Sequence, residues 1–303
     1  EMHHFDGRVD YRIGKGELEK HTPGDALFVA SDGIAEYLEE ADSKKFISWV
    51  DVLQSSRAES HRRYRDWRIS TGDLMSDPRV RVYYTFDDQE PGDRMLVNQA
   101  GTSSLQDGAV VGSRWTQGRW RDKGALNFGR PSDRVRFSVE GDAKAMTLVS
   151  WVRFDRVTGR PQVLLSPDSG ADGLPHWRVD EKGKLQLRVP VNGGKRHESI
   201  VSTTPALSRK SQGRWHHLTT VIDSESRKVS HFVNGKPAGS SKLKTKPDLR
   251  LGRVQLGNNE PVKGAKTKAT PGFLTGRMDE FVIFADALSA DEIVSLFKAG
   301  KPR

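Results

Sequence analysis

Apolar and polar residues alternate in short runs along most of the chain, which is the period of strands that bury one face. From about residue 79 onward, Gly, Asn, Asp and Pro turns join these runs, and Asn234-Gly235 predicts a tight hairpin turn. The clearest predicted strands cover residues 80–86, 146–154, 215–222, 228–233 and 278–284. Regular strands with few helical segments indicate a mainly β, antiparallel sandwich.

Helical spacing occurs in two places. A linker over residues 42–77 has apolar residues at helical spacing within 46–53 and an arginine-rich stretch over 57–68, and it ends at Asp77-Pro78. A closing helix begins at a capping box of Ser289 and Glu292 and ends at Gly300. Its apolar face comprises Ile293, Leu296 and Phe297.

The first 41 residues carry strand patterns of their own. Val9, Tyr11 and Ile13 alternate with charged residues, and residues 26–30 form a second apolar run. Two strands are too few to close a stable sheet. We therefore expect three segments: the end of an incomplete β domain (1–41), the helical linker (42–77) and the sandwich (78–303).

Composition narrows the chemistry. The 303 residues include no cysteine, which excludes disulfides, cysteine-ligated zinc and thiol catalysis. The net charge of +9 raises the possibility of nucleic acid, but 40 acidic residues are interspersed among 49 basic ones. Positive charge without a binding motif is weak evidence for nucleic-acid binding. Nucleic acid is therefore not an expected partner. Aromatic or recognition-helix residues beside the 57–68 stretch would be needed to support that alternative.

Several motifs in the second half share one resemblance. Residues 146–152 (MTLVSWV), 213–218 (GRWHHL) followed by Asp223, 231–236 (HFVNGK), 276–284 (GRMDEFVIF) and 287–293 (ALSADEI) resemble, in order, strands and the closing segment of laminin G-like domains. Residues 83–87 (YYTFD) and 124–128 (GALNF) resemble the opening strands. The resemblance implies a concanavalin A-like jelly roll that binds a polysaccharide or a cell-envelope protein.

The N-terminal segment resembles the end of FecR-like domains through residues 5–9 (FDGRV) and 21–26 (HTPGDA). That resemblance implies an extracytoplasmic, periplasmic or cell-surface module of a regulator in a sigma-factor pathway, anchored by an upstream membrane helix. The helix, any cytoplasmic segment and most of the FecR-like domain are absent from this sequence, so the signalling role rests on analogy.

Catalysis is not expected. Glucanases on this fold use paired carboxylates on one face of a strand, and retaining enzymes hold them about 5 Å apart. Asp279 and Glu280 are adjacent, so strict strand alternation places them on opposite faces. A polysaccharide hydrolase remains an alternative, and two facing carboxylates in a groove would favour it.

Calcium is a candidate cofactor, because laminin G-like folds often hold one Ca²⁺ at a sandwich edge and calcium prefers oxygen ligands. The resemblance points to Asp87, Asp88, Asp133 and Asp279. The alternative is that Asp133 and Asp279 cap turns or pair with Arg134 and Arg277.

Two sets of residues are candidates for ligand contact. Aromatic rings with neighbouring amide or imidazole groups suit a sugar, and the candidates are Trp115, Trp120, His176, Trp177, Asn258 and Asn259. Trp177 fits a core position equally well. A lysine-rich region suits an anionic glycan, with candidates Lys242, Lys244, Lys246, Lys263, Lys266 and Lys268. Solvated loops are the alternative for these lysines.

These observations favour a non-catalytic, extracytoplasmic binding or sensor module for a polysaccharide or cell-envelope ligand. The main alternative is a protein–protein interaction or adhesion module without sugar affinity, which an exposed apolar face on the 46–53 helix would favour.

Overall fold

The computed structural model describes residues 2–5, 8–11, 67, 72–87, 93–100, 106–157, 159–168, 175–258 and 272–302. The chain forms two compact units, Glu1–Arg62 and Arg63–Arg303. In the smaller unit, strands β1 (Met2–Phe5) and β2 (Arg8–Tyr11) pair in antiparallel fashion. The alternation around Val9 and Tyr11 thus belongs to the second strand of a hairpin. The predicted strand at 26–30 and helix at 46–53 lie outside the described residues.

The larger unit is built from short antiparallel strands and a closing helix. Its described elements are β3 (Val80–Tyr84), β4 (Met95–Leu96), β5 (Gly108–Val111), β6 (Arg114–Gln117), β7 (Gly124–Phe128), β8 (Arg134–Asp142), β9 (Ala145–Phe154), β10 (Gln162–Pro167), β11 (His176–Val179), β12 (Lys184–Val191), β13 (Arg196–Pro205), β14 (Trp215–Asp223), β15 (Lys228–Val233), β16 (Lys236–Lys242), β17 (Arg250–Leu256), β18 (Gly276–Phe284) and α3 (Ala290–Gly300). Residues 72–76 form a further helical segment before β3.

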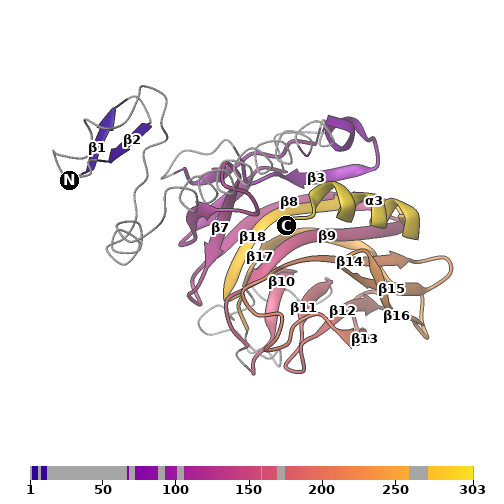
Figure 1. The fold of residues 1–303 in the computed structure, drawn as a ribbon. Helices are drawn as coiled ribbons and strands as arrows, with labels where there is room; N and C mark the ends of the chain where they lie inside the picture. The colour runs from indigo at the N-terminus through magenta and orange to yellow at the C-terminus, as the bar shows by residue number, and fades with distance from the viewer. Residues whose placement is uncertain are drawn as a thin grey trace, which may run out of the picture. The chain divides into compact units, whose positions relative to one another are not determined.

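These strands form two eight-stranded sheets. Sheet I has the order β13-β12-β11-β10-β17-β8-β5-β4. Sheet II has the order β16-β15-β14-β9-β18-β7-β6. Strand β18 pairs with β7 at residues 276–278 and with β3 at residues 281–284, so β3 and β7 follow one another along the same edge of β18. Figure 1 shows helix α3 against sheet II, near β18 and β9, and the ring of Phe297 in α3 stacks on Trp151 of β9 at 5.7 Å. The fold is a concanavalin A-like jelly-roll sandwich, as the sequence predicts.

Apolar side chains from both sheets fill the space between them. Tyr84 and Phe281 of sheet II meet Phe137 of sheet I, with ring centroids 5.3 and 6.1 Å from that of Phe137. All three rings are buried. Burying such a ring stabilises the fold by about 1.5–3 kcal/mol, so the aromatic contacts contribute much of the attraction between the sheets.

A chain of hydrogen bonds also crosses this core. Trp177 of β11 donates its indole N–H to the Thr220 hydroxyl of β14 at 2.8 Å, and that hydroxyl lies 2.9 Å from Nδ1 of His231 on β15. His231 Nε2 lies 3.1 Å from the carbonyl oxygen of Ile200 on β13. A carbonyl only accepts, so Nε2 carries the proton and Nδ1 accepts from Thr220. These hydrogen bonds therefore run from sheet I to sheet II, at Thr220 and His231, and back to sheet I at Ile200.

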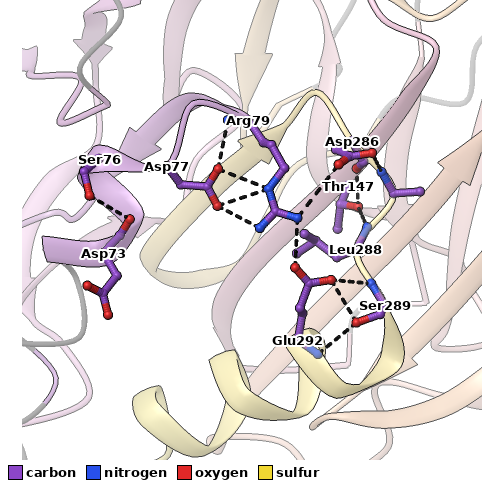
Figure 2. Close-up of polar contacts among 10 residues, drawn as sticks. Asp73, Ser76, Asp77, Arg79, Thr147, Asp286, Leu288, Ser289 and Glu292 are labelled. Atoms are coloured by element: carbon purple, nitrogen blue, oxygen red, sulfur yellow. Dashed lines mark hydrogen bonds and ion pairs between the residues drawn. The ribbon is translucent and has the colours of Figure 1, made fainter.

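The outer side of sheet II is covered. A second apolar cluster there includes Tyr83, Phe284 and Ile293, and Leu74 of the 72–76 segment packs against it. Figure 2 shows Arg79, at the start of this surface, among three acidic side chains, Asp77, Asp286 and Glu292. Its guanidinium binds Asp77 at 2.8 Å and the α3 residue Glu292 at 2.8 Å. The segment before β3 is thereby tied to the first turn of α3.

Local sequence signals placed most of these elements correctly. The predicted strands 80–86, 146–154, 215–222, 228–233 and 278–284 correspond to β3, β9, β14, β15 and β18. Asn234 and Gly235 both have positive φ, 53° and 72°, which is the conformation of the predicted hairpin turn. The capping box of Ser289 and Glu292 is formed, with α3 running from Ala290 to Gly300.

Candidate functional site

The outer face of sheet I carries polar side chains in register. His176 of β11 lies opposite Arg188 of β12, and Arg178 lies opposite Gln186. The intervening Trp177 is fully buried in the core. Because successive residues of a strand point to opposite faces, the four polar residues point away from the core. They are all half-buried.

Positive charge dominates this face. Its outward arginines are Arg134, Arg136, Arg178, Arg188 and Arg253. Acidic residues on the described strands and their ends include Asp168, Glu140 and Asp142; Asp168 pairs with Arg136 at 2.6 Å, and Asp142 at the end of β8 pairs with Arg250 at 3.4 Å. No Trp, Tyr or Phe points outward from the described strands of sheet I. The face therefore offers charge and hydrogen bonds rather than a stacking platform.

Hydrogen bonds hold the middle of the face. Arg134 donates to the Gln255 side-chain oxygen at 3.4 Å, and the Gln255 amide donates to Ser166 at 3.4 Å. Ser166 and Gln255 are buried, whereas the side chain of Arg136 is 50% exposed. The rigid polar centre is therefore flanked by solvent-accessible arginine on β8.

At the β11–β13 end, cationic groups converge. The His176 and His197 rings lie 6.4 Å apart between centroids, edge to face. Arg178 donates from Nε to Gln186 at 2.6 Å, which fixes the plane of its guanidinium. Burial, together with the positive charge of Arg188, His197 and Arg178, lowers the pKa of His176 to about 3. The imidazole is therefore neutral at physiological pH, while the two guanidinium groups stay charged.

A different charged cluster lies inside the larger unit, around Asp279 and Glu280. A register shift in β18 between Met278 and Glu280 breaks the strand alternation. Arg119 binds the Asp279 carboxylate at 2.9 Å and the Glu280 carboxylate at 2.5 Å. The expectation of opposite faces was therefore wrong, because a β-bulge re-aims one side chain. Both carboxylates are bound by cations, which gives no support for a hydrolytic pair.

Aromatic rings enclose the Arg119 guanidinium. Its central carbon lies 4.6 Å from the ring centroids of both Trp120 and Trp151. Lys123 adds a second buried cation, with Nζ 3.2 Å from the Asp279 carboxylate and 4.2 Å from the Trp67 ring centroid. Burial lowers the pKa of Lys123, and the charge of Asp279 opposes that shift. The balanced charges indicate a structural cluster.

The aspartates singled out for calcium lie in separate settings. The two oxygens of Asp279 are taken by Arg119 and Lys123, so this residue does not fit a calcium ligand. Asp133 accepts from the backbone N–H groups of Gly129 and Arg130, at 2.9 and 3.0 Å, and closes a turn.

Asp87 accepts from the Gly124 N–H at 3.2 Å, and Asp88 lies outside the described residues. The described ranges contain no group of three or more His, Asp or Glu side chains arranged to hold a metal ion. Calcium binding therefore stays a prediction without a described site.

The residues proposed for sugar contact are dispersed. Trp115 on β6 is half-buried and donates to the Asp93 carbonyl at 3.1 Å. Trp120 is 5% exposed beside Arg119, and Trp177 is fully buried in the core. Asn258 is buried and donates to the Pro131 carbonyl oxygen. Asn259 lies outside the described residues, and of this set only His176 points onto the outer face of sheet I.

The lysine-rich region is only partly described. Lys242, Lys244 and Lys246 are exposed around the end of β16. Glu225 pairs with Lys246 at 2.6 Å, and Glu198 accepts from the Lys244 backbone N–H at 2.7 Å. Neighbouring carboxylates thus partly offset the positive charge. Lys263, Lys266 and Lys268 lie outside the described residues.

A family comparison identifies the fold independently. Residues 128–294 match a laminin G-type family model described as the concanavalin A-like lectin/glucanases superfamily. The chain belongs to this superfamily. Comparison with curated protein sequences gives no significant match. Within the described concanavalin A-like unit and hairpin, no helix has the length and apolar character needed to cross a membrane.

Solved structures are similar to the concanavalin A-like unit. The binding domain of Paraclostridial Mosquitocidal Protein 1 aligns with TM-score 0.55 and 15% identity, over 72% of this chain and 52% of that one. The botulinum neurotoxin serotype D ligand binding domain, in complex with N-acetylneuraminic acid, aligns with TM-score 0.54 and 13% identity, over 73% and 51%. Botulinum neurotoxin type C, which depends upon interaction with two ganglioside molecules to enter cells, aligns with TM-score 0.54 and 12% identity, over 73% and 51%.

These identities show a shared fold. The chain spans about half the length of each of these structures.

Sequence reasoning found His176 but missed the arginines around it. The available signal was polar residues at every second position, 176 and 178 in one strand and 184, 186 and 188 in the next. That pattern marks an outward polar face. Grouping the arginines required the strand order, because Arg253 and Arg136 lie far apart in sequence.

Proposed function

We propose that the sandwich is a non-catalytic binding module for an acidic polysaccharide, held by the outer face of sheet I. The observation that carries this proposal is the surplus of outward arginines, Arg134, Arg136, Arg178, Arg188 and Arg253, over the acidic residues Asp168, Glu140 and Asp142. Arginine presents planar, bidentate donors that match carboxylate and sulfate groups. The face offers no outward aromatic ring in its described strands, which favours a charged ligand over a neutral one.

Two further observations support this proposal. The outer side of sheet II is covered by α3 and the 72–76 segment, which leaves sheet I as the polar face of the described sandwich. A structurally similar toxin domain has been seen in complex with an acidic sugar, N-acetylneuraminic acid. For a catalytic role, Asp279 and Glu280 are unsuitable because Arg119 and Lys123 bind them inside the protein.

The test is retention of the purified chain on heparin, polygalacturonate and dextran, at low and high salt. We expect retention on the two polyanions, weakened by salt, and none on neutral dextran. The triple variant Arg178→Gln, Arg188→Gln, Arg253→Gln should lose at least about tenfold in affinity, the equivalent of about 1.4 kcal/mol. Equal binding to dextran, or no binding to any of the three, would overturn the proposal.

A matched control separates this face from the lysine-rich region. The double variant Lys242→Gln, Lys244→Gln removes exposed charge beside β16 and leaves sheet I intact. We expect it to bind nearly as the wild type does. Loss of binding in the lysine variant alone would move the site to that region, the location that the sequence first indicated.

For the biological setting, we propose that this module belongs to an extracytoplasmic, membrane-anchored regulator of a sigma-factor pathway. The proposal is supported by the FecR-like resemblance of residues 5–9 and 21–26, which the described hairpin covers only in part. Protease digestion of intact and of lysed spheroplasts from cells that make the full-length protein tests it. Cleavage of the sandwich in intact spheroplasts is expected, and protection until lysis would contradict it.

A further inference from the structure

Exposed apolar side chains gather at the β4–β5 edge of sheet I. Among the described residues five large apolar side chains are exposed, and three of them lie here: Met95, Val97 and Val111, which are 56%, 37% and 41% exposed. Ala109 of β5 is also exposed and lies directly opposite Met95. Single exposed apolar residues are ordinary on a protein surface, whereas a cluster of them is a sign of a binding site.

The strand pattern places these four side chains on one face. Leu96 and Val110, which alternate with them along the chain, are buried in the core between the two sheets. Because successive residues of a strand point to opposite faces, the residues on either side of Leu96 and Val110 point away from the core. They form an apolar strip on the outer face of sheet I. We call Met95, Val97, Ala109 and Val111 the β4–β5 stripe.

The β4–β5 stripe borders the arginine face. Ala109 lies directly opposite Arg136 of β8, and Val111 lies directly opposite Arg134. Opposite residues on one face of a sheet have Cβ atoms about 5 Å apart. One unit of a bound polymer can therefore touch apolar surface on β5 while a neighbouring unit lies over the guanidinium groups.

The two guanidinium groups leave the stripe uncovered. Arg136 donates to Asp168, after β10, at 2.6 Å, and Arg134 donates to Gln255 of β17 at 3.4 Å. In the strand order β10-β17-β8-β5-β4, both partners lie on the opposite side of β8 from the stripe. These hydrogen bonds draw the arginine side chains away from β5, which accounts for the exposure of Val111 beside them.

We propose that the β4–β5 stripe binds short acyl groups, such as acetyl esters, of an acidic polysaccharide whose charged groups lie on the arginine face. This inference rests on the proposed function, since it narrows the ligand to an acylated acidic polysaccharide. An acetyl ester adds an apolar methyl group and no charge. Burial of that methyl group requires only a few apolar side chains, and the stripe supplies them next to the arginines.

Size and charge argue against a protein partner on the stripe. A stable protein interface has about 20–30 residues on each side and is centred on large anchors, commonly Trp or Tyr. The stripe has four apolar side chains, and none of them is aromatic. A second copy of this chain would use the same surface on both partners, which would bring Arg134 and Arg136 of the two copies close together. Facing like charges oppose such pairing.

The probes are polygalacturonate and O-acetylated polygalacturonate of the same chain length, so the number of carboxylates is equal. We expect the purified chain to bind the acetylated polymer about three- to fivefold more tightly, since one buried methyl-sized group contributes about 0.8 kcal/mol, or about fourfold in affinity. Salt should weaken the binding of both polymers and leave this ratio unchanged, because an apolar contact is not screened. Equal affinity for the two polymers would overturn the proposal.

Variants of nearly unchanged shape locate the acyl site. The double variant Met95→Gln, Val111→Thr replaces apolar by polar surface. It should bind the two polymers equally and keep the wild-type affinity for polygalacturonate. Val157→Thr is the matched control, because Val157 is 39% exposed and follows β9 of sheet II, and it should keep the preference. Thermal unfolding of each variant verifies folding. An unchanged preference in the double variant would overturn the assignment to the stripe.

The two proposals fail in different ways. If both polymers are retained with equal affinity, acyl recognition is wrong and the proposed function stands. If neither polymer is retained, the proposed function is wrong, and acyl recognition is wrong with it. Sedimentation of the chain without polymer tests the remaining occupant: a dimer that the variant Met95→Gln, Val111→Thr abolishes would show that a second copy covers the stripe, and would overturn the proposal.

Discussion

Asp279 and Glu280 are neighbours in sequence, yet both carboxylates bind the guanidinium of Arg119, at 2.9 and 2.5 Å. The same guanidinium donates to the Gly300 carbonyl at the end of α3, at 2.7 Å. One buried arginine therefore joins the bulge in β18 to the closing helix. The arrangement leads to specific expectations for stability.

Arg119→Gln should destabilise the protein by about 3–5 kcal/mol, because removing one partner leaves buried carboxylates without a counter-charge. Urea unfolding measures the change. Arg250→Gln is the matched control, since the Arg250 side chain is 69% exposed and lies 3.4 Å from an exposed Asp142. Exposed pairs contribute about 0–1 kcal/mol. Similar losses for the two variants would contradict the role assigned to Arg119.

Gly300→Ala should lower stability by about 1–3 kcal/mol, although alanine favours a helix. A Cβ at this position would lie 2.4 Å from Arg119 Nη1 and 2.6 Å from Trp151 Nε1, and both side chains are buried. Gly129→Ala is the comparison, because its Cβ would meet nothing within 4 Å. Thermal unfolding of the two variants measures the difference in stability. A Gly300→Ala variant as stable as Gly129→Ala would show that Arg119 and Trp151 move aside at little cost in free energy.

Arg79→Ala should loosen the closing helix more than it lowers global stability. The side chains of Arg79 and Glu292 are each 39% exposed, so their 2.8 Å pair contributes at most about 1 kcal/mol. Hydrogen exchange over residues 290–300 should nevertheless accelerate, since Figure 2 places this pair at the first turn of α3. Arg79→Lys should restore part of the protection, and unchanged exchange in Arg79→Ala would argue against the tie.

Stability should fall as the pH drops below about 6.5, the ordinary pKa of histidine. Burial lowers the pKa of His217 to about 3 and that of His231 to about 4. The unfolded state therefore binds more protons than the folded state between these values and about 6.5, so the contribution is complete above that range and is lost on acidification.

The slope is about 1.4 kcal/mol per pH unit for each such histidine. Urea unfolding across this pH range measures it. His217→Gln, which removes one titrating group beside Trp151, should flatten the curve by about that amount. A pH profile unchanged by this substitution would show that His217 is not buried in its neutral form.

Much of the fold could be predicted from local signals. The alternation in β9 and β14, the Asn234-Gly235 turn and the capping box at Ser289 each depend on residues close together in sequence. Such signals report on local geometry, and here they also agree with the global fold. The boundaries of β18 and α3 followed to within two residues.

The candidate site was harder to predict because it depends on strand order and on one irregularity. Arg253 and Arg136 share a face only because β17 and β8 are neighbours in sheet I. The β-bulge beside Asp279 could not be predicted from the alternation of apolar and polar residues along the strand. Arg119 was overlooked because an arginine in a turn-rich stretch normally indicates solvent exposure.

Arg79 and α3 lie on the outer side of sheet II, so the two outer faces of the sandwich differ: one is covered and the other carries the arginines. Both the segment that enters β3 and the closing helix run on the side away from Arg178 and Arg188. Copies held side by side through these segments would all turn their arginine faces outward. A long polyanion could then contact several copies at once, and the resulting avidity would exceed the affinity of one face without any additional contact.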